Sequence, residues 1–171
     1  MPSTKRKSVA VMIEGALCIA LSIVLSYFDL FKMPQGGSVD FALMPLILFT
    51  YRRGLKWGVQ AGIVSGLIRI LLGSYIYNPV QAIVDYPLAY AFIGLTAAHP
   101  RIIGLILSAI GKIACHVVSG AIFFAEYAKG QNPWIYSLVY NTPVESVKYI
   151  LSGIVALILW KALERELPVS E

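Results

Sequence analysis

The chain is dominated by apolar stretches that approach the length needed to cross a lipid bilayer. A helix needs about 20 residues to span the hydrocarbon core. Six such segments, separated by turn or charge signals, are expected as helices at 8–29, 39–51, 55–72, 79–97, 101–128 and 136–163, of which 39–51 is the shortest. We therefore predict an all-α integral membrane protein, a six-transmembrane-helix bundle in which residues 1–171 form a single domain.

The composition agrees with a lipid environment. Hydrophobic residues make up 58% of the chain and charged residues 13%, with a mean hydropathy of +0.74, so too little polar surface is available for a soluble domain of this size. The basic residues at 5–7 precede an apolar stretch that is longer than the core of a signal peptide and lacks a convincing cleavage site. We predict that this stretch is retained as the first helix.

The basic residues predict the orientation, because short cytoplasmic loops carry an excess of Lys and Arg. Lys32 and Lys129 fall on one side of the predicted bundle. The other side, expected to be cytoplasmic and to carry both termini, holds Lys5, Arg6, Lys7, Arg52, Arg53, Lys56, Arg101, Lys161 and Arg165. Because these residues are dispersed over several loops, the net charge of +5 does not indicate a nucleic-acid partner.

Ionisable and hydrogen-bonding side chains lie inside three of the predicted helices. Such a group is costly at membrane depth unless it faces a cavity lined by protein. Lys112 and His116 are spaced by four residues, as are Asn141 and Glu145, so each pair shares a helix face. Together with Asp85, these residues are expected to converge on one ligand cavity in the outer half of the bundle.

The chemistry of that cavity favours a planar, nitrogen-rich, cationic small molecule. A carboxylate offsets positive charge, an aromatic face attracts it by about 0.5 to 2 kcal/mol, and Asn or His pairs with ring heteroatoms. Structural alternatives remain open: Lys112 and Glu145 as a buried ion pair, Asp85 paired with Arg69 or Lys112, and His116 as a packed core residue. No metal or cofactor is expected, because the two cysteines lie in separate apolar spans.

Four segments carry a resemblance to a known family. They are Met33–Val39 (MPQGGSV), Asn78–Tyr86 (NPVQAIVDY), His116–Phe124 (HVVSGAIFF) and Trp134–Asn141 (WIYSLVYN). In order, and over nearly the whole chain, they resemble the thiamine-specific substrate-binding (S) component of energy-coupling factor (ECF) transporters. The resemblance implies a multi-pass protein of the bacterial cell membrane that captures thiamine from outside. It also implies a transmembrane coupling protein and two ATP-binding-cassette (ABC) ATPases as partners.

The resemblance also implies which residues bind thiamine. Asp85 matches the family's acidic ligand residue, which is often Glu, and Phe124 stands where some members have Trp. The complete implied ligand set is Asp85, Tyr86, Lys112, His116, Gly120, Phe124, Tyr136 and Asn141. A gate over this site is expected in the first outer loop, at Gln35, Gly36, Gly37 and Ser38.

The first helix carries a second signal, because Ala16 and Ala20 form a face that allows another helix to approach closely. The resemblance implies that this face docks the coupling protein, whereas packing inside the bundle is the alternative. No Walker-type loop occurs, so energy comes from partners or an ion gradient.

Three other functions remain open. One is a stand-alone proton-coupled thiamine carrier with Asp85 or Glu145 as its protonation site, and another is an S component for a different vitamin. An intramembrane enzyme using His116 with a carboxylate is the third, but it lacks an obvious nucleophile or metal set.

Overall fold

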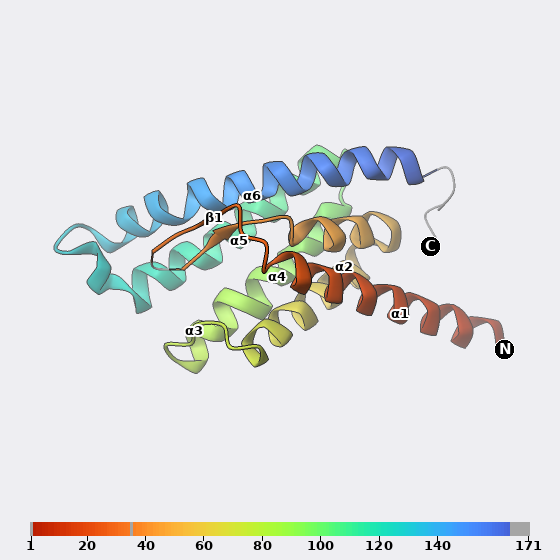
Figure 1. Ribbon diagram of the computed structural model, residues 1–171, viewed down its shortest axis with the longest axis horizontal. Helices are drawn as coiled ribbons and strands as arrows, with labels where there is room; N and C mark the ends of the chain where they lie inside the picture. Colours follow the sequence, from red (N-terminus) through yellow and green to blue (C-terminus); the bar gives the residue numbers. More distant parts are fainter. Residues whose placement is uncertain (1, 35, 165–171) are drawn as a thin grey trace.

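The computed structural model describes residues 2–34 and 36–164, with side chains described from residue 8 onward. Most of this chain is helical (Figure 1), and the protein is an integral membrane protein. The α-helices are α1 (Pro2–Leu25), α2 (Leu43–Leu71), α3 (Pro79–Ile83), α4 (Ala89–Ala91), α5 (Arg101–Phe123) and α6 (Pro133–Leu163). The π-helical turn η1 (Val84–Leu88) and the 3-10 turn η2 (Phe92–Ala97) complete the helical segment 79–97, and the 3-10 turn η3 (Ala125–Ala128) follows α5. The start of α1 and the end of α6 lie at the same end of the molecule (Figure 1).

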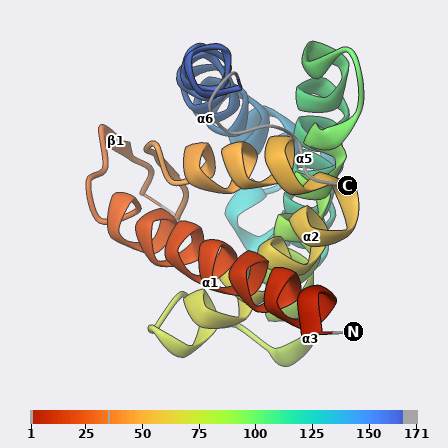
Figure 2. The ribbon, with the colours of Figure 1, turned by 90° about the vertical axis from the view of Figure 1, so that its right-hand side faces the viewer.

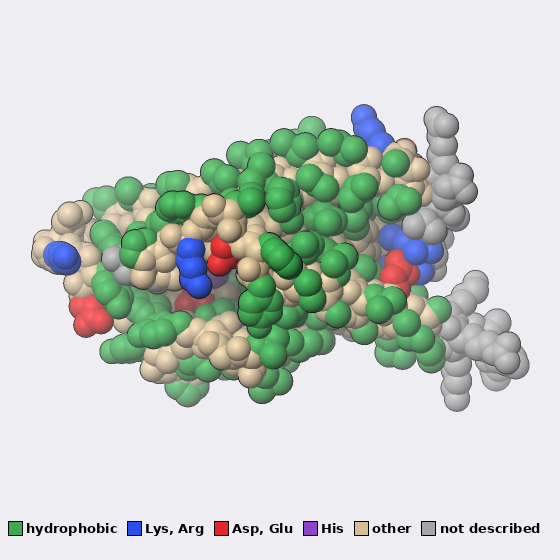
Figure 3. Space-filling view, in the orientation of Figure 1, with side chains coloured by type: hydrophobic (Ala, Val, Ile, Leu, Met, Phe, Trp, Pro, Cys, Tyr) green, Lys and Arg blue, Asp and Glu red, His purple; other side chains and the backbone are tan. Residues whose placement is uncertain are grey.

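Length and composition mark four segments of the described chain as able to cross a membrane. They are Ser8–Leu25, Pro79–Ala97, Arg101–Phe123 and Pro133–Leu163. Hydrophobic side chains cover most of the face shown in Figure 3, as expected for helices that meet lipid. Four spans are thus identified among the described residues, where the sequence led us to expect six.

Helix α2 accounts for the difference. The helices expected at 39–51 and 55–72 are found as two helices that share the label α2 and are separated by a kink at Gly54, whose backbone adopts φ 81° and ψ −178°. This positive φ is readily available only to glycine. The part before the break, 43–53, is only about 16 Å long, roughly half the thickness of the hydrocarbon core. Neither part is among the four segments identified above as able to cross a membrane.

The segment between α1 and α2 is a small hairpin, so the fold is not wholly helical. Strand β1 (Phe31–Lys32) pairs with β2 (Ser38–Val39) in antiparallel register, with Phe31 opposite Val39. Gly36 and Gly37 both have φ 93° and supply the left-handed backbone of the connection. The hydroxyl of Tyr140 on α6 donates to the Gly36 carbonyl at 3.2 Å, which ties the hairpin to α6.

Several helix boundaries also differ from the predicted ones: α1 begins at Pro2 and not at residue 8, and α2 begins at Leu43 and not at residue 39. The first helix, expected to reach residue 29, ends at Leu25. The helix expected to reach residue 128 ends at Phe123, because Phe124 leaves helical backbone geometry (φ −123°, ψ 26°). Helix α6 begins before the expected residue 136, at Pro133, because the Asn132 side chain caps it by accepting from Trp134 N at 2.9 Å.

Close packing against α2 fixes the segment that carries Asp85. The glycines at 58, 62 and 66 repeat every four residues and allow backbones to approach. A Cβ atom on Gly66 would lie 2.5 Å from the carbonyl carbon of Tyr86, so η1 lies directly on this glycine face. Helix α2 packs against both α1 and α6, and Figure 2 shows α1 in front of α2.

Helix α1 is joined to α2 by charge as well as by packing. The Glu14 carboxylate accepts from Arg52 at 3.0 Å and from Nε of Arg53 at 3.0 Å. These arginines stand directly before the break at Gly54, so the ion pairs hold α1 at this point. Ala16 and Ala20 are both exposed on α1, so they do not pack inside the bundle.

Candidate functional site

A cavity of about 160 Å³ lies in the half of the molecule that is away from the start of α1. The hairpin connection, the loop 73–78, α3, η1, the end of α5, η3 and the first part of α6 all contribute to its walls. Seven of the eight ligand residues expected from the sequence line it: Asp85, Tyr86, His116, Gly120, Phe124, Tyr136 and Asn141. The structure thus brings together residues from three separate helical segments.

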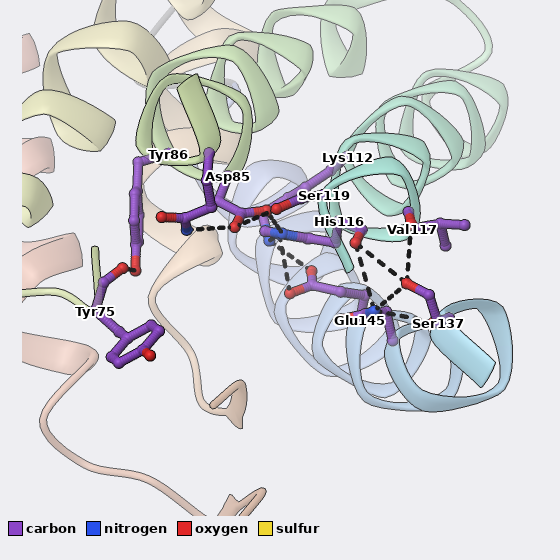
Figure 4. A network of polar contacts seen from close by, with 11 residues as sticks. Tyr75, Asp85, Tyr86, Lys112, His116, Val117, Ser119, Ser137 and Glu145 are labelled. Carbon is purple, nitrogen blue, oxygen red and sulfur yellow. Dashed lines mark hydrogen bonds and ion pairs between the residues drawn. The ribbon is translucent and has the colours of Figure 1, made fainter. Parts of the chain in front are cut away.

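The Asp85 carboxylate contacts three other side chains at the cavity. Its Oδ2 accepts from the Ser119 hydroxyl at 2.7 Å and from the Gln81 amide at 2.6 Å, and its Oδ1 lies 3.1 Å from His116 Nδ1 (Figure 4). Asp85 belongs to η1, which contains Pro87. Proline lacks a backbone donor, and π-helical turns recur at functional sites because they re-aim side chains.

The alternative in which Asp85 pairs with Arg69 or Lys112 is not found among the described residues. Arg69 donates to the Ser22 hydroxyl at 3.1 Å and lies over the Tyr90 ring, 4.8 Å from its centroid. Lys112 donates to Glu145 instead, at 2.7 Å. The Asp85 carboxylate is therefore held by neutral donors and an imidazole and keeps its charge available to the cavity.

Lys112 is the one expected ligand residue that does not line this cavity. It is 1% exposed, and its ammonium group lies between Glu145 Oε2 at 2.7 Å and His116 Nε2 at 3.0 Å. Helical spacing correctly predicted that Lys112 shares a face of α5 with His116. The ion pair with Glu145, however, keeps the Lys112 ammonium group behind the imidazole. Because an ammonium group only donates, Nε2 of His116 is the acceptor, and Nδ1 carries the proton that is donated to Asp85.

Aromatic rings form another part of the cavity wall. Phe124 contacts the rings of Tyr77, Tyr75 and Tyr127, with centroids 5.7, 5.9 and 6.2 Å away. The Phe124 side chain reaches this position because the backbone leaves the α5 helix there. Tyr136 stacks on Tyr140 with centroids 5.9 Å apart. The cavity therefore offers flat apolar faces beside a carboxylate.

The first turns of α6 add a carboxamide. The Asn141 amide donates to the Ser137 carbonyl at 2.9 Å and to the Ser137 hydroxyl at 3.1 Å. Gly120 lies against Ser137, and a Cβ atom there would collide with the serine hydroxyl. Glycine at this position thus allows α5 and α6 to approach closely beside the cavity.

The expected gate loop lies partly in this wall. Gly36 and Gly37 line the cavity, whereas Ser38 turns away and donates to Asp40 at 2.9 Å. Gln35 lies outside the described residues.

A second and larger cavity, of about 470 Å³, lies on the other side of His116 and Glu145. Figure 3 shows charged side chains of both signs beside a hollow in this face of the molecule. Lys148 pairs with Asp40 at 2.8 Å within it. This cavity has fewer aromatic residues in its wall, and its charges are largely paired with one another. The first cavity is therefore the better candidate for a planar cationic ligand.

Several residues of the site were not anticipated as ligand or positioning residues, namely Gln81, Ser119, Tyr75, Tyr127 and Tyr140. Gln81 precedes Asp85 by four residues, so helical periodicity could have placed the two together. Tyr75 lies in an irregular loop and carries no periodic signal. Among the described residues, no group of His, Cys, Asp and Glu side chains is arranged to hold a metal ion.

These features define a class of protein. Membrane-length helices enclose a cavity whose wall combines a carboxylate, an imidazole, a carboxamide and aromatic rings. Such a protein is an integral membrane protein with an internal site for a small polar ligand.

Comparison with known proteins gives the family. Residues 12–167 match the family described as thiamine transporter protein (Thia_YuaJ). The thiamine transporter ThiT of Bacillus subtilis is 34% identical over 181 aligned positions, which cover 93% of this chain and 94% of that protein. ThiT of Lacticaseibacillus paracasei is 28% identical over 160 positions, or 80% of each chain. The chain belongs to the thiamine transporter family, whose members here are transporters and not enzymes.

Solved structures show the same fold. The structure of ThiT from Listeria monocytogenes superimposes with a TM-score of 0.85 at 26% identity, covering 93% of this chain and 97% of that one. The S component of a bacterial ECF transporter gives a TM-score of 0.68 at 20% identity, covering 94% and 99% of the two chains. The second similarity concerns the fold alone.

Proposed function

We propose that this protein is the high-affinity thiamine-binding S component of an ECF-type ABC importer, and that thiamine binds in the cavity beside Asp85. The observation that carries the proposal is the Asp85 carboxylate, held by three side chains and facing aromatic rings, in a chain of the thiamine transporter family. Thiamine joins a cationic thiazolium ring to a neutral aminopyrimidine. Both rings are planar, and the cavity supplies flat faces together with one accessible negative charge.

Each wall then has a distinct role. Asp85 offsets the thiazolium charge or accepts from the aminopyrimidine amino group, as a charge-assisted hydrogen bond. Phe124 and Tyr136 hold the rings through their faces, where a cation gains about 0.5 to 2 kcal/mol. The Asn141 amide group already donates to Ser137, which leaves its carbonyl oxygen as an acceptor for the ligand. No cofactor is required for binding of this kind.

Lys112 and Glu145 act behind the ligand. Their ion pair, at 2.7 Å, fixes the charge next to His116, and the imidazole in turn donates to Asp85. A chain of polar contacts therefore runs from α6 through α5 to η1 (Figure 4). We assign Lys112 to this supporting chain and not to direct contact with thiamine.

The same proposal includes the orientation and the partners. The cavity and the hairpin lie in the outer half of a bacterial plasma-membrane protein, with both termini in the cytoplasm. The basic residues Arg52, Arg53 and Arg101 belong to the opposite part of the helices, in agreement with the positive-inside rule. Ala16 and Ala20, exposed on α1, offer a docking face for the transmembrane coupling protein, which in turn engages two ABC ATPases.

Calorimetry of the detergent-purified protein tests the ligand. We expect heat of binding with thiamine and none with riboflavin or biotin at the same concentrations. Binding of riboflavin or biotin in preference to thiamine would show that the protein is specific for another vitamin. No binding of any of the three would remove the proposed site.

Uptake measurements test the source of energy. We expect thiamine accumulation in cells to require the coupling protein and both ATPases, because the sequence contains no Walker-type loop. Accumulation that persists without the ATPases and is abolished by an uncoupler would favour the stand-alone proton-coupled carrier.

A further inference from the structure

Gln81 is almost completely buried, with 2% of its surface exposed, and both ends of its amide group are used. Its Nε2 donates to Asp85 Oδ2 at 2.6 Å, and its Oε1 accepts from the backbone N–H of Tyr77 at 2.9 Å. A backbone N–H only donates and a carboxylate only accepts, so a single orientation of the amide satisfies both partners. The Gln81 backbone is fixed as well, because its N–H donates to the Asn78 side chain at 2.9 Å.

The residue that Gln81 holds on its other side, Tyr77, packs against Phe124, which lines the cavity. The Tyr77 ring lies 5.7 Å from Phe124, and the Tyr75 ring lies 5.9 Å from the same ring. The Tyr86 hydroxyl donates to the Tyr75 carbonyl at 3.0 Å. The loop 74–78 is thus attached to the Asp85 segment by hydrogen bonds at Tyr75, Tyr77 and Asn78, and to Phe124 by two ring contacts.

We propose that Gln81 is a positioning residue of the thiamine site, which orients the Asp85 carboxylate and holds the loop 74–78 against Phe124. This inference rests on the proposed function of the cavity. One buried amide connects the negative charge to the loop that packs against Phe124, so the two parts of the site form together. Gln81 does not touch the ligand in this role, and it acts through Asp85 and Tyr77.

The consequence is an energetic coupling between Gln81 and Asp85. Without the amide, Oδ2 of Asp85 loses a short hydrogen bond and the carboxylate becomes free to rotate. The Tyr77 N–H is left without its acceptor, and the loop loses one of its hydrogen-bonded attachments. Part of the loss of thiamine affinity in a variant without the Gln81 amide therefore arises because the Asp85 carboxylate is no longer oriented. That part should be absent when Asp85 is itself substituted.

A double-mutant cycle measured by calorimetry tests this coupling. We expect Gln81→Met, which has a similar length but no hydrogen bonds, to weaken thiamine binding by about tenfold to a hundredfold. With Asp85→Asn present in addition, the combined loss should be smaller than the product of the two single losses. Gln60→Met, the same exchange at an exposed position of α2, is the matched control and should bind like the parent.

Hydrogen exchange of the free protein supplies a readout that does not depend on the ligand. Amide exchange in residues 74–78 should accelerate in Gln81→Met and remain unchanged in Asp85→Asn and Gln60→Met. If Gln81→Met is recovered only in unfolded form, Gln81→Asn, which is one methylene shorter, takes its place with the same expected losses.

The outcomes separate the two proposals. Parent-like affinity in Gln81→Met, or losses that multiply independently with Asp85→Asn, would overturn the role of Gln81 and leave the thiamine site in place. Failure of the parent protein to bind thiamine would remove the proposed function and this inference with it.

Discussion

Among single residues, Asp85 carries the charge on which the proposed recognition of thiamine depends. Asp85→Asn keeps the size of the side chain but replaces an acceptor by an amide that faces two donors, Ser119 and Gln81. We expect thiamine binding to weaken by roughly 1.5 to 3 kcal/mol, the scale of a charge-assisted hydrogen bond, whereas Asp85→Glu should be tolerated better. Calorimetry measures both variants, and unchanged affinity in Asp85→Asn would exclude the proposed role.

Phe124 tests the aromatic wall. Phe124→Trp should keep or strengthen thiamine affinity, because indole offers the better face to a cation. Phe124→Ala should weaken binding, since it removes a ring that contacts three tyrosines and lines the cavity. The two variants are compared by thiamine titration after size-exclusion chromatography has shown that both are folded. An alanine variant that binds like the parent would place the ligand elsewhere.

How far these residues could be anticipated depends on periodicity. His116 and Gly120 are four residues apart on α5, as are Asn141 and Glu145 on α6, so the sequence alone placed each pair on a shared face that the structure turns toward one cavity. The same spacing cannot show that Lys112 lies behind His116, because its partner Glu145 comes from another helix. Tyr75 could not be anticipated, since its position depends on a hydrogen bond from Tyr86 and on packing against Phe124.

At the scale of one helix, variants of α1 test whether ligand binding can be separated from the proposed energy coupling. Ala16→Leu and Ala20→Leu add bulk to an exposed face that lines neither cavity. We expect thiamine affinity to stay within about twofold of the parent. Thiamine uptake, and co-purification with the coupling protein, should fall sharply, because close helix approach is blocked.

The matched control for this variant is a substitution beside the same face. Leu17→Ile exchanges one exposed apolar side chain of α1 for another and should preserve uptake. Normal uptake in a well-expressed Ala16→Leu, Ala20→Leu double variant would remove α1 as the docking face. Loss of thiamine binding in that variant would show instead that the added bulk disturbs the bundle.

The apolar runs predicted the helices, but they did not predict the kink, the hairpin or the π-helical turn that connect or interrupt them. A run of hydrophobic residues predicts a helix without showing how the two helices on either side of the kink at Gly54 are arranged. Strands of two residues, such as Phe31–Lys32, are too short to produce an alternating pattern. The π-helical turn around Asp85 forms against the glycine face of α2, so it depends on tertiary contacts that local sequence does not encode.

In the whole molecule, the charges of the site are withdrawn from solvent. The Asp85 side chain is 14% exposed, Glu145 9%, and Lys112 2%. Dissolved ions weaken interactions between surface charges, since the Debye length is about 10 Å at 0.1 M salt, but they screen buried groups far less. We expect thiamine affinity to change by less than about threefold between roughly 0.02 and 0.5 M NaCl. A steep decline in calorimetric affinity with salt would show that the cation is held at an exposed surface.

The burial of this carboxylate also bears on where such a protein can work. Bacteria meet rainwater, soil moisture and brine, and an open electrostatic trap for a cation would lose strength whenever the surroundings became salty. The Asp85 carboxylate is enclosed among side chains with a fixed set of partners. Its electrostatic environment is therefore set by the protein. On the proposed function, vitamin capture in this arrangement depends little on the habitat's ionic composition.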